Sequence, residues 1–427
     1  MASSLRSGAD NTSFITNFTG SDRHVLDYLT AEVLNQLPAS VQEFLLQTSI
    51  LTWLHPELCD AVSGRQDSGQ LLNQLAGNNL FQGPATGPWY RYHALFAHVL
   101  QVHLQEQKPE QVASLHQRAA AWLAENQYFG AALGHSLAAD DLEQAASLLN
   151  SHPQTIWRQL GLARMTNILD TLPPEILTRF PRLGAYRALG ALIQGKLREL
   201  PALLDSVPVN QTDEVSGMLA VIRTYLAIFQ NDPENILAWA QEAIEKLPWE
   251  QILWRSFATL AAGDGHALAG QLPSAADFYS EAIYLGKKSH LPFSVLLAGW
   301  KLGTLRWQQG QLHDCQQLCA ELQEYIRQHK LEQLPRTGAI HALQALLARE
   351  RGELELAQAK ISAALAACRP EKPIFAWCLY SQILIGYSSR QLDRVRQAIG
   401  ELEAIQRDQG LPGFLTFQVD REQALTC

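Results

Sequence analysis

Apolar residues in the C-terminal half of the chain recur every three or four positions, the spacing of one face of an α-helix. Between residues 312 and 326 this stripe consists of Leu312, Cys315, Cys319, Leu322 and Ile326. A short turn, Gly-Gln-Leu or a close variant, precedes that helix, and the same turn precedes other stripes that begin at Leu272, Leu354 and Leu392. Because these starts lie about 40 residues apart, the pattern predicts a solenoid of helical hairpins.

Residues 39–108 follow a different pattern, with short helices and two strands. Ser40 and Glu43 form a capping box at the start of a helix. Amphipathic stretches predict short helices over residues 41–48, 56–62, 68–76 and 95–104. Between the last two, the strand candidates 79–82 and 89–92 flank a connector rich in Gly and Pro. Helices followed by a two-stranded hairpin and a final helix predict a winged-helix-like module.

The whole pattern divides the chain into four segments, which cover residues 1–38, 39–108, 109–182 and 183–427. The first segment contains one predicted helix, and the third contains several. These helices cover residues 25–37, 112–125, 129–138 and 142–149, with an irregular one over 155–172. We predict a mostly α protein, in which the winged-helix-like module is followed by a right-handed α-α superhelix of TPR-like helical hairpins.

Composition and charge narrow the class of protein. The 427-residue chain is 47% hydrophobic and 18% charged, which is typical of a folded protein. Its formal net charge is −9 and it has no long Lys/Arg run, so direct nucleic-acid binding is not expected. No signal-like segment follows Met1, and no apolar run approaches the roughly 20 residues of a membrane span. Most of the six cysteines lie in apolar stripes, as reduced thiols do, so we predict a cytoplasmic protein.

One stretch partly matches the sequence pattern of a nucleotide-binding P-loop. Residues 190–196 fit the spacing G-x4-G-K, but Leu197 stands where a P-loop requires Ser or Thr. A helix is also expected before this stretch, whereas a P-loop follows a strand. We interpret Gly195 as one more copy of the repeat turn.

The sequence also offers little evidence for a metal site or for a catalytic site. Three histidines recur every five residues and therefore do not share one helical face: His93, His98 and His103. His313, Cys315 and Cys319 are closer to ligand spacing, but both cysteines lie on an apolar stripe and are interpreted as core residues. The hydrolase patterns G-x-S-x-G and H-E-x-x-H do not occur. The sequence therefore predicts no metal site and no enzyme.

Several stretches together resemble one protein family, the large ATP-dependent LuxR-type transcriptional regulators, a MalT-like group within the STAND class of signal-transduction NTPases. The stretches are residues 18–29, 41–51, 58–62, 79–81, 90–96 and 115–120. The resemblance is dense over residues 14–150 and continues more loosely into the repeats. The motifs are specific as a set, although each alone would not be.

The resemblance implies an order of domains: P-loop NTPase, helical arm, winged helix, superhelical sensor and a LuxR-type helix-turn-helix. In these terms residues 1–38 are the end of the arm, 39–108 the winged helix, 109–182 a helical linker with the first irregular hairpins, and 183–427 the sensor. No Walker motif precedes Phe14 and no helix-turn-helix phrase follows Gly410. We therefore expect no cofactor in this chain, since ATP or ADP would belong to an absent NTPase domain. The array also has no evident polar cap at its C-terminal end, so a further domain or partner is expected there.

The resemblance also suggests site residues. His93, which follows a strand and opens a helix, resembles the histidine that senses the nucleotide phosphate in STAND proteins, a role that needs the NTPase domain. Its alternative role is helix capping or packing of the hairpin. In this family the superhelix receives an inducer, an oligosaccharide in the best-known member. We predict Arg255, Arg306 and Trp307 as residues that line this groove, although most aromatic residues of the array are expected to pack between repeats.

Two functions remain open at this point. The first is the signal-sensing part of a regulator, which binds a small-molecule inducer or a protein partner, with self-association as a further option. The second is a generic TPR adaptor that binds a peptide or protein partner and regulates no transcription. A P-loop upstream and a helix-turn-helix downstream would favour the regulator.

Overall fold

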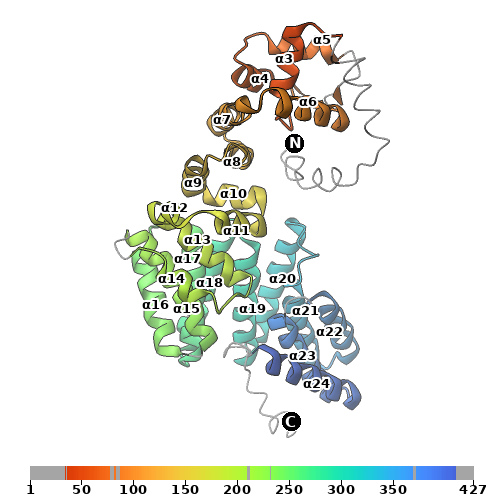
Figure 1. Ribbon diagram of the computed structural model, residues 1–427. Coiled ribbons are helices and arrows are strands. Elements are labelled where there is room, and N and C mark those ends of the chain that lie inside the picture. The colour runs from red at the N-terminus through yellow and green to blue at the C-terminus, as the bar shows by residue number, and fades with distance from the viewer. Residues whose placement is uncertain are drawn as a thin grey trace. The chain divides into compact units, whose positions relative to one another are not determined.

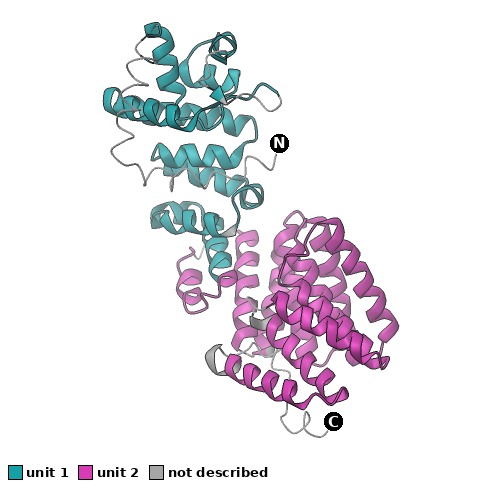
Figure 2. Cartoon of the chain, turned by 90° about the vertical axis from the view of Figure 1, so that its right-hand side faces the viewer, with its two compact units in different colours: residues 1–191 teal, residues 192–427 magenta. Residues whose placement is uncertain are grey.

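The computed structural model describes residues 34, 36–76, 81–82, 87–208, 212–230, 232–368 and 372–409. The chain forms two compact units, residues 1–191 and 192–427 (Figure 2). Most of the predicted arm segment, 1–38, and the last stretch, 410–427, lie outside the described residues. The described residues are predominantly helical, which confirms the mostly α prediction.

The first part of unit 1 is a winged-helix module. Its elements are α3 (Ala39–Thr48), α4 (Pro56–Ser63), α5 (Ser68–Ala76), β1 (Phe81–Gln82), β2 (Arg91–Tyr92) and α6 (Ala94–Gln107). The strands pair antiparallel, with Phe81 opposite Tyr92. This confirms the predicted hairpin, although its described strands are shorter than expected. Leu54 adds one more rung, because its backbone exchanges two hydrogen bonds with Tyr90.

Tyr92 joins the hairpin to the helices of this module. Its ring is buried and stacks on Phe81 with centroids 5.1 Å apart. Its hydroxyl lies 2.7 Å from Thr48 Oγ1 in α3, so the buried polar end of the ring has a hydrogen-bond partner. This contact fixes the position of β2, and therefore of the residue that follows it, His93.

Helices make up the rest of unit 1: α7 (Pro109–Glu125), α8 (Phe129–Ala138), α9 (Leu142–Ser151), α10 (Pro153–Leu160), α11 (Leu162–Thr171), α12 (Pro174–Arg179) and α13 (Pro181–Ile193). The single irregular helix that we predicted over 155–172 is wrong, since α10 and α11 replace it. Gly161 separates them with φ 81° and ψ 161°, a conformation that cannot continue a helix. The two units divide within α13, whereas the sequence placed the start of the sensor at residue 183.

Unit 2 is an array of helical hairpins (Figure 1). After the short α14 (Leu200–Asp205), the first helices of the hairpins are α15 (Asp213–Gln230), α17 (Ile252–Leu268), α19 (Pro292–Gln308), α21 (Thr337–Glu350) and α23 (Lys372–Ser388). The second helices are α16 (Pro233–Lys246), α18 (Leu272–Lys288), α20 (Leu312–Gln328), α22 (Leu354–Cys368) and α24 (Leu392–Gln409). The TPR-like hairpin array predicted from the repeated stripe is confirmed.

The recurring turn closes the first helix of a hairpin with a left-handed residue. Gly310 has φ 72° and donates its N–H to Trp307 O, and Gln311 N then donates to Arg306 O at 2.9 Å. These two bonds satisfy carbonyl groups that the end of α19 would otherwise leave without partners. Gly270 and Gly352 repeat the geometry, while Arg390 adopts it without the freedom of glycine.

Gly195 belongs to the same class of turn, with φ 74°. Helix α13 precedes it, where a P-loop would need a strand, and its N–H donates to Leu192 O. Residues 190–196 therefore end a helix and do not form a P-loop, but Gly195 is not a full copy of the repeat turn, since no helix begins two residues after it. The helix predicted after this turn begins only at Leu200, as α14.

Replacing Gly310 by alanine should lower the free energy of unfolding by about 1 kcal/mol, because a Cβ is disfavoured at positive φ. No atom outside its immediate chain neighbours lies within 4 Å of a Cβ built at Gly310, so crowding does not enter. Gly400→Ala is the matched control: it has the same open surroundings but lies inside α24, where alanine should stabilise by about 0.5–1 kcal/mol. Urea unfolding followed by circular dichroism measures both changes, and equal signs would contradict this account.

Candidate functional site

The first helices of the array form its inner layer. They pack on one another in succession, α15 on α17, α17 on α19, α19 on α21 and α21 on α23, while each second helix packs against first helices. In a curved stack, the layer whose helices approach one another more closely lies on the concave side. The inner layer (α15, α17, α19, α21 and α23) therefore lines the concave face, which solenoid proteins commonly use for binding.

A buried charged pair joins two helices of the inner layer. Lys301 Nζ in α19 donates to Asp264 Oδ2 in α17, and Tyr279 of α18 donates its hydroxyl to Asp264 Oδ1 at 2.9 Å. Asp264 is fully buried and Lys301 is 8% exposed. Burial raises the pKa of Asp264 and lowers that of Lys301, while their mutual attraction opposes both changes. Such a pair persists only because each charge satisfies the other.

Gly263 makes room for this cluster. A Cβ at this position would come within 2.6 Å of the Tyr279 ring, so a side chain here would displace the tyrosine from Asp264. Burial raises the pKa of the Tyr279 phenol well above its usual value, and the neighbouring Asp264 charge raises it further. The phenol therefore acts as a hydrogen-bond donor.

A row of aromatic rings crosses the inner layer beside this cluster. Tyr225 of α15 and Phe257 of α17 have ring centroids 6.3 Å apart, and Phe293 of α19 lies 5.8 Å from Phe257. The Arg336 guanidinium, just before α21, lies 3.5 Å from the centroid of Phe293. The row thus combines apolar faces with a positive charge across successive hairpins.

A second aromatic group lies on the later hairpins. Trp300 of α19 and Trp377 of α23 have ring centroids 5.9 Å apart, although α21 stands between those helices in the array. Both rings are buried and belong to the hydrophobic core of the array. The predicted groove residue Trp307 is half-buried at the edge of this group, 6.5 Å from Trp377.

The other two predicted groove residues occupy different positions. Arg306 is half-buried near the end of α19, and its Nη1 donates to the backbone oxygen of Asp314 at 3.2 Å. Arg255 is 6% exposed, and its Nη1 donates to the carbonyl oxygens of Ile244 and Leu247, at 2.9 and 2.7 Å. These carbonyls belong to the end of α16, so the geometry favours a helix-capping role for Arg255. Arg306 and Trp307 are consecutive residues of α19 with partners on different helices, α20 and α23, while Arg255 lies on α17, so the groove role of all three stays a prediction.

His93 lies where the sequence placed it, between β2 and α6. It is the N-cap residue of α6 and is exposed, and its side chain makes no capping hydrogen bond. The backbone carbonyl of His93 accepts instead, from Ala97 N at 2.9 Å. An exposed imidazole at a helix start suits contact with another domain, but its nucleotide-sensing role stays a prediction.

Metal-binding geometry is not found in the described part of the chain: no group of three or more His, Cys, Asp or Glu side chains is arranged to hold an ion. Cys315 and Cys319 are buried in the core, as predicted for the stripe of α20. No helix among the described residues is long and apolar enough to cross a membrane.

Comparison with known families gives these features a context. Residues 30–112 match the family described as the MalT winged helix domain, and residues 217–409 match the MalT-like TPR region. This chain is a distant homologue of the MalT regulators. Its MalT-like winged helix carries His93, and its MalT-like TPR region carries the inner layer with Asp264, Lys301 and the aromatic row.

The individual relatives agree with this assignment. The chain is 28% identical over 322 residues to the HTH-type transcriptional regulator MalT of Serratia proteamaculans, and 27% identical over 324 residues to that of Yersinia pestis. Each match covers 73% of this chain and 36% of the MalT protein, so the chain spans about a third of the length of these relatives.

A solved structure shares the fold. It is a STAND protein with a tetratricopeptide repeat sensor from Pyrococcus horikoshii, with a TM-score of 0.60 and 12% sequence identity. The similarity covers 93% of this chain and 64% of that one. At this identity the likeness concerns the fold alone.

The charged cluster in the MalT-like TPR region was missed by the sequence analysis, although a signal for it exists. Asp264 interrupts a run of small and apolar residues in α17, and Lys301 stands between Trp300 and Leu302 in α19. A charge inside an otherwise apolar helical stretch indicates a buried partner. The sequence does not say which residue that partner is.

The MalT-like chain also contains a histidine pair in unit 1 that the sequence did not suggest. His116 of α7 and His135 of α8 have their Nδ1 atoms 2.8 Å apart, so one ring donates and the other accepts. Burial lowers the pKa of His116, and burial together with His116 lowers the pKa of His135 to about 3. Both rings are therefore neutral near pH 7, and a neutral ring is what the accepting partner of this hydrogen bond must be.

Removing one partner of the Asp264–Lys301 pair should lower the free energy of unfolding more than removing both. Lys301→Met leaves Asp264 buried without its counter-charge and should cost about 3 kcal/mol, because an uncompensated buried charge is strongly unfavourable. The double variant Asp264→Asn/Lys301→Met should recover most of this loss, since the asparagine still accepts from Tyr279. Urea unfolding of Asp264→Asn, Lys301→Met and the double variant measures the coupling, and strictly additive losses would contradict it.

The histidine pair should make unit 1 less stable in acid. The folded-state pKa of His135 lies below its unfolded value, so the unfolded chain binds protons first as the pH falls below about 6.5. Between pH 7.5 and 5 we expect a loss of about 1–2 kcal/mol. His135→Gln should reduce this dependence, whereas the exposed His313→Gln should not. Thermal unfolding at both pH values tests this, and an unchanged slope in His135→Gln would refute it.

Proposed function

We propose that this chain is the signal-sensing part of a MalT-type regulator. Its inner layer binds an inducer or a protein partner, and binding alters how neighbouring modules assemble. The observation that carries the proposal is the buried Asp264–Lys301–Tyr279 cluster, which lies beside an aromatic row of the inner layer in a MalT-like TPR region. Buried ionisable groups next to aromatic rings are typical of binding sites for small polar ligands.

The mechanism follows from how the array is built. The charged pair joins α17 to α19, and the aromatic row joins α15, α17 and α19, so small rotations between hairpins alter both contacts. A ligand that fits one arrangement better shifts the population toward it. Arg306 and Trp307 are the proposed groove residues at the far end of α19, whereas the capping contacts of Arg255 make it a weaker candidate.

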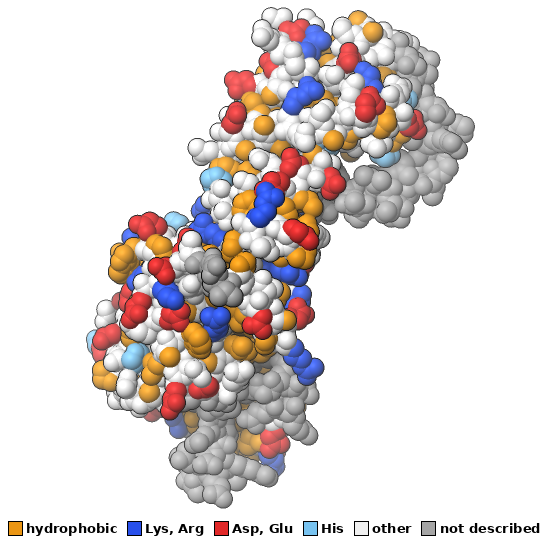
Figure 3. Space-filling model, turned by 60° about the vertical axis from the view of Figure 1, so that its left-hand side comes forward, with side chains coloured by type: hydrophobic (Ala, Val, Ile, Leu, Met, Phe, Trp, Pro, Cys, Tyr) orange, Lys and Arg blue, Asp and Glu red, His pale blue; other side chains and the backbone are white. Residues whose placement is uncertain are grey.

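The partners that we propose are a small-molecule inducer, a protein or peptide, or a second copy of the chain in a cytoplasmic setting. On the face drawn in Figure 3, Lys and Arg side chains are interspersed with Asp and Glu and form no single basic patch. This agrees with the net charge of −9 and disfavours direct binding of nucleic acid. His93 would sense a nucleotide only together with an NTPase domain.

A thermal-shift screen of the chain against sugars, nucleotides and amphipathic peptides tests the proposal. A ligand that binds only the folded array should raise the unfolding midpoint in proportion to the logarithm of its concentration. Arg306→Ala and Trp307→Ala should each weaken that ligand about 10-fold or more, while Arg396→Ala on α24 serves as a surface control.

The chemical class of the ligand found in the screen distinguishes the inducer sensor from the peptide-binding adaptor. A sugar or nucleotide supports the inducer sensor, whereas response to peptides alone favours the adaptor. If the affinity of the hit is the same in both groove variants, the inner face near Arg306 and Trp307 is not the site.

A further inference from the structure

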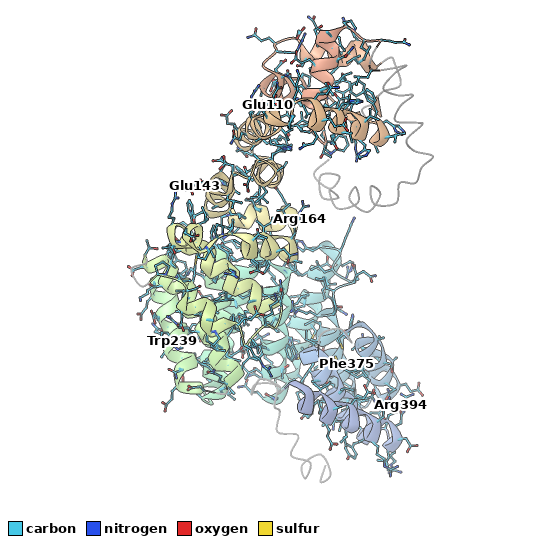
Figure 4. All side chains as sticks on the ribbon, in the orientation of Figure 1. Glu110, Glu143, Arg164, Trp239, Phe375 and Arg394 are labelled. Atoms are coloured by element: carbon cyan, nitrogen blue, oxygen red, sulfur yellow. The ribbon has the colours of Figure 1, made fainter. Side chains whose placement is uncertain are left out.

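A hollow lies at the start of the array, lined by other residues than those of the Asp264 cluster. It has a volume of about 240 Å³ and is formed by α14, the last turns of α15 and the first turns of α16. Six of its lining residues matter here: Leu204, Asp205, Arg223, Ala227, Asp232 and Trp239. Trp239 is labelled on its helix in Figure 4. Since one water molecule occupies about 30 Å³ of liquid, the hollow has the volume of about eight waters.

Arg223 supplies an oriented positive charge to this hollow. Its guanidinium carbon lies 5.0 Å from the centroid of the Trp239 ring, and the side chain is half-buried. Among the described residues, no acceptor forms a hydrogen bond or ion pair with its N–H groups. A guanidinium held on an aromatic face keeps its planar fork of donors directed outward, which suits a carboxylate.

The two carboxylates of the lining differ in availability. Asp232 caps α16 and accepts from Asn235 N at 3.3 Å and from Asn235 Nδ2 at 2.6 Å, so its oxygens are engaged. Asp205, at the end of α14, is exposed and has no ion pair with any described residue. It would repel a purely anionic ligand and attract a cationic group. Leu204 and Ala227 are almost fully buried and provide an apolar wall.

We propose that this hollow binds a small zwitterion of the amino-acid type. Its carboxylate pairs with Arg223, its ammonium group faces Asp205, and its side chain packs against Leu204 and Ala227. The volume admits a molecule of about eight to ten non-hydrogen atoms. This site uses other residues than the inner face of the later hairpins, so it goes beyond the sensor function proposed above.

Isothermal titration of the full chain with the common amino acids tests the proposal. Each amino acid is compared with two matched probes: the amine that lacks the carboxylate, and the N-acetyl derivative that lacks the ammonium charge. At least one amino acid should bind, and both of its matched probes should bind about 10-fold more weakly or worse. Arg223→Gln and Asp205→Asn should each weaken binding to a similar extent, whereas Arg394→Gln, exposed on α24, should not.

Several results would overturn the proposal. One is the absence of binding by every amino acid at millimolar concentration; another is equal binding of the N-acetyl derivative, which would mark a plain anion site. If Arg223→Gln does not fold, the exposed Asp205→Asn variant decides by itself, and unchanged affinity there refutes the ammonium contact. Arg306→Ala and Trp307→Ala should leave amino-acid affinity unchanged, so failure of this site and failure of the proposed sensor groove are distinguishable.

Discussion

The array depends on the close approach of its two helix layers, because a single hairpin cannot bury its own apolar stripe. Small residues at the crossing points make this possible. A Cβ at Gly263, Gly299 or Gly338 would come within 2.9 Å of the facing second helix, against Tyr279, Leu322 and Cys368 respectively. The repeated stripe therefore has a counterpart in the first helices: a glycine where the partner helix crosses. Hairpins joined in this way share one continuous core from α17 to α24.

The parts of this fold that could be predicted from sequence are those set by local chemistry. The turn at Gly310 requires a left-handed residue, and the stripe that follows has helical periodicity, so both are visible without a structure. The break at Gly161 was missed because apolar periodicity continues on both sides of it. The rung at Leu54 was missed for another reason: one residue paired with Tyr90 leaves no strand pattern in the sequence.

In the candidate site, the contacts that could not be predicted from the sequence are those between residues far apart in the chain. Arg255 does lie over an aromatic ring, with its guanidinium carbon 3.9 Å from the centroid of Trp249, but its Nη1 also donates to carbonyls at the end of the preceding helix, which no side-chain pattern reveals. Asp264 and Lys301 lie 37 residues apart, close to one repeat, so stacking of consecutive hairpins brings them together. Arg306 and Trp307 lie near the end of α19, and their role in a groove stays a prediction, because helical periodicity fixes which helix carries them but not what they contact.

Helix α15 connects the two proposed binding regions. Arg223 and Tyr225 are two residues apart, about 200° around the helix, so they point to different sides. Arg223 reaches Trp239 on α16, while Tyr225 reaches Phe257 on α17 and donates to its carbonyl at 3.3 Å. A ligand that rotates α15 by engaging Arg223 would also move the first ring of the inner aromatic row. Any coupling between the two regions must then be reciprocal, with each ligand changing the affinity for the other by the same factor.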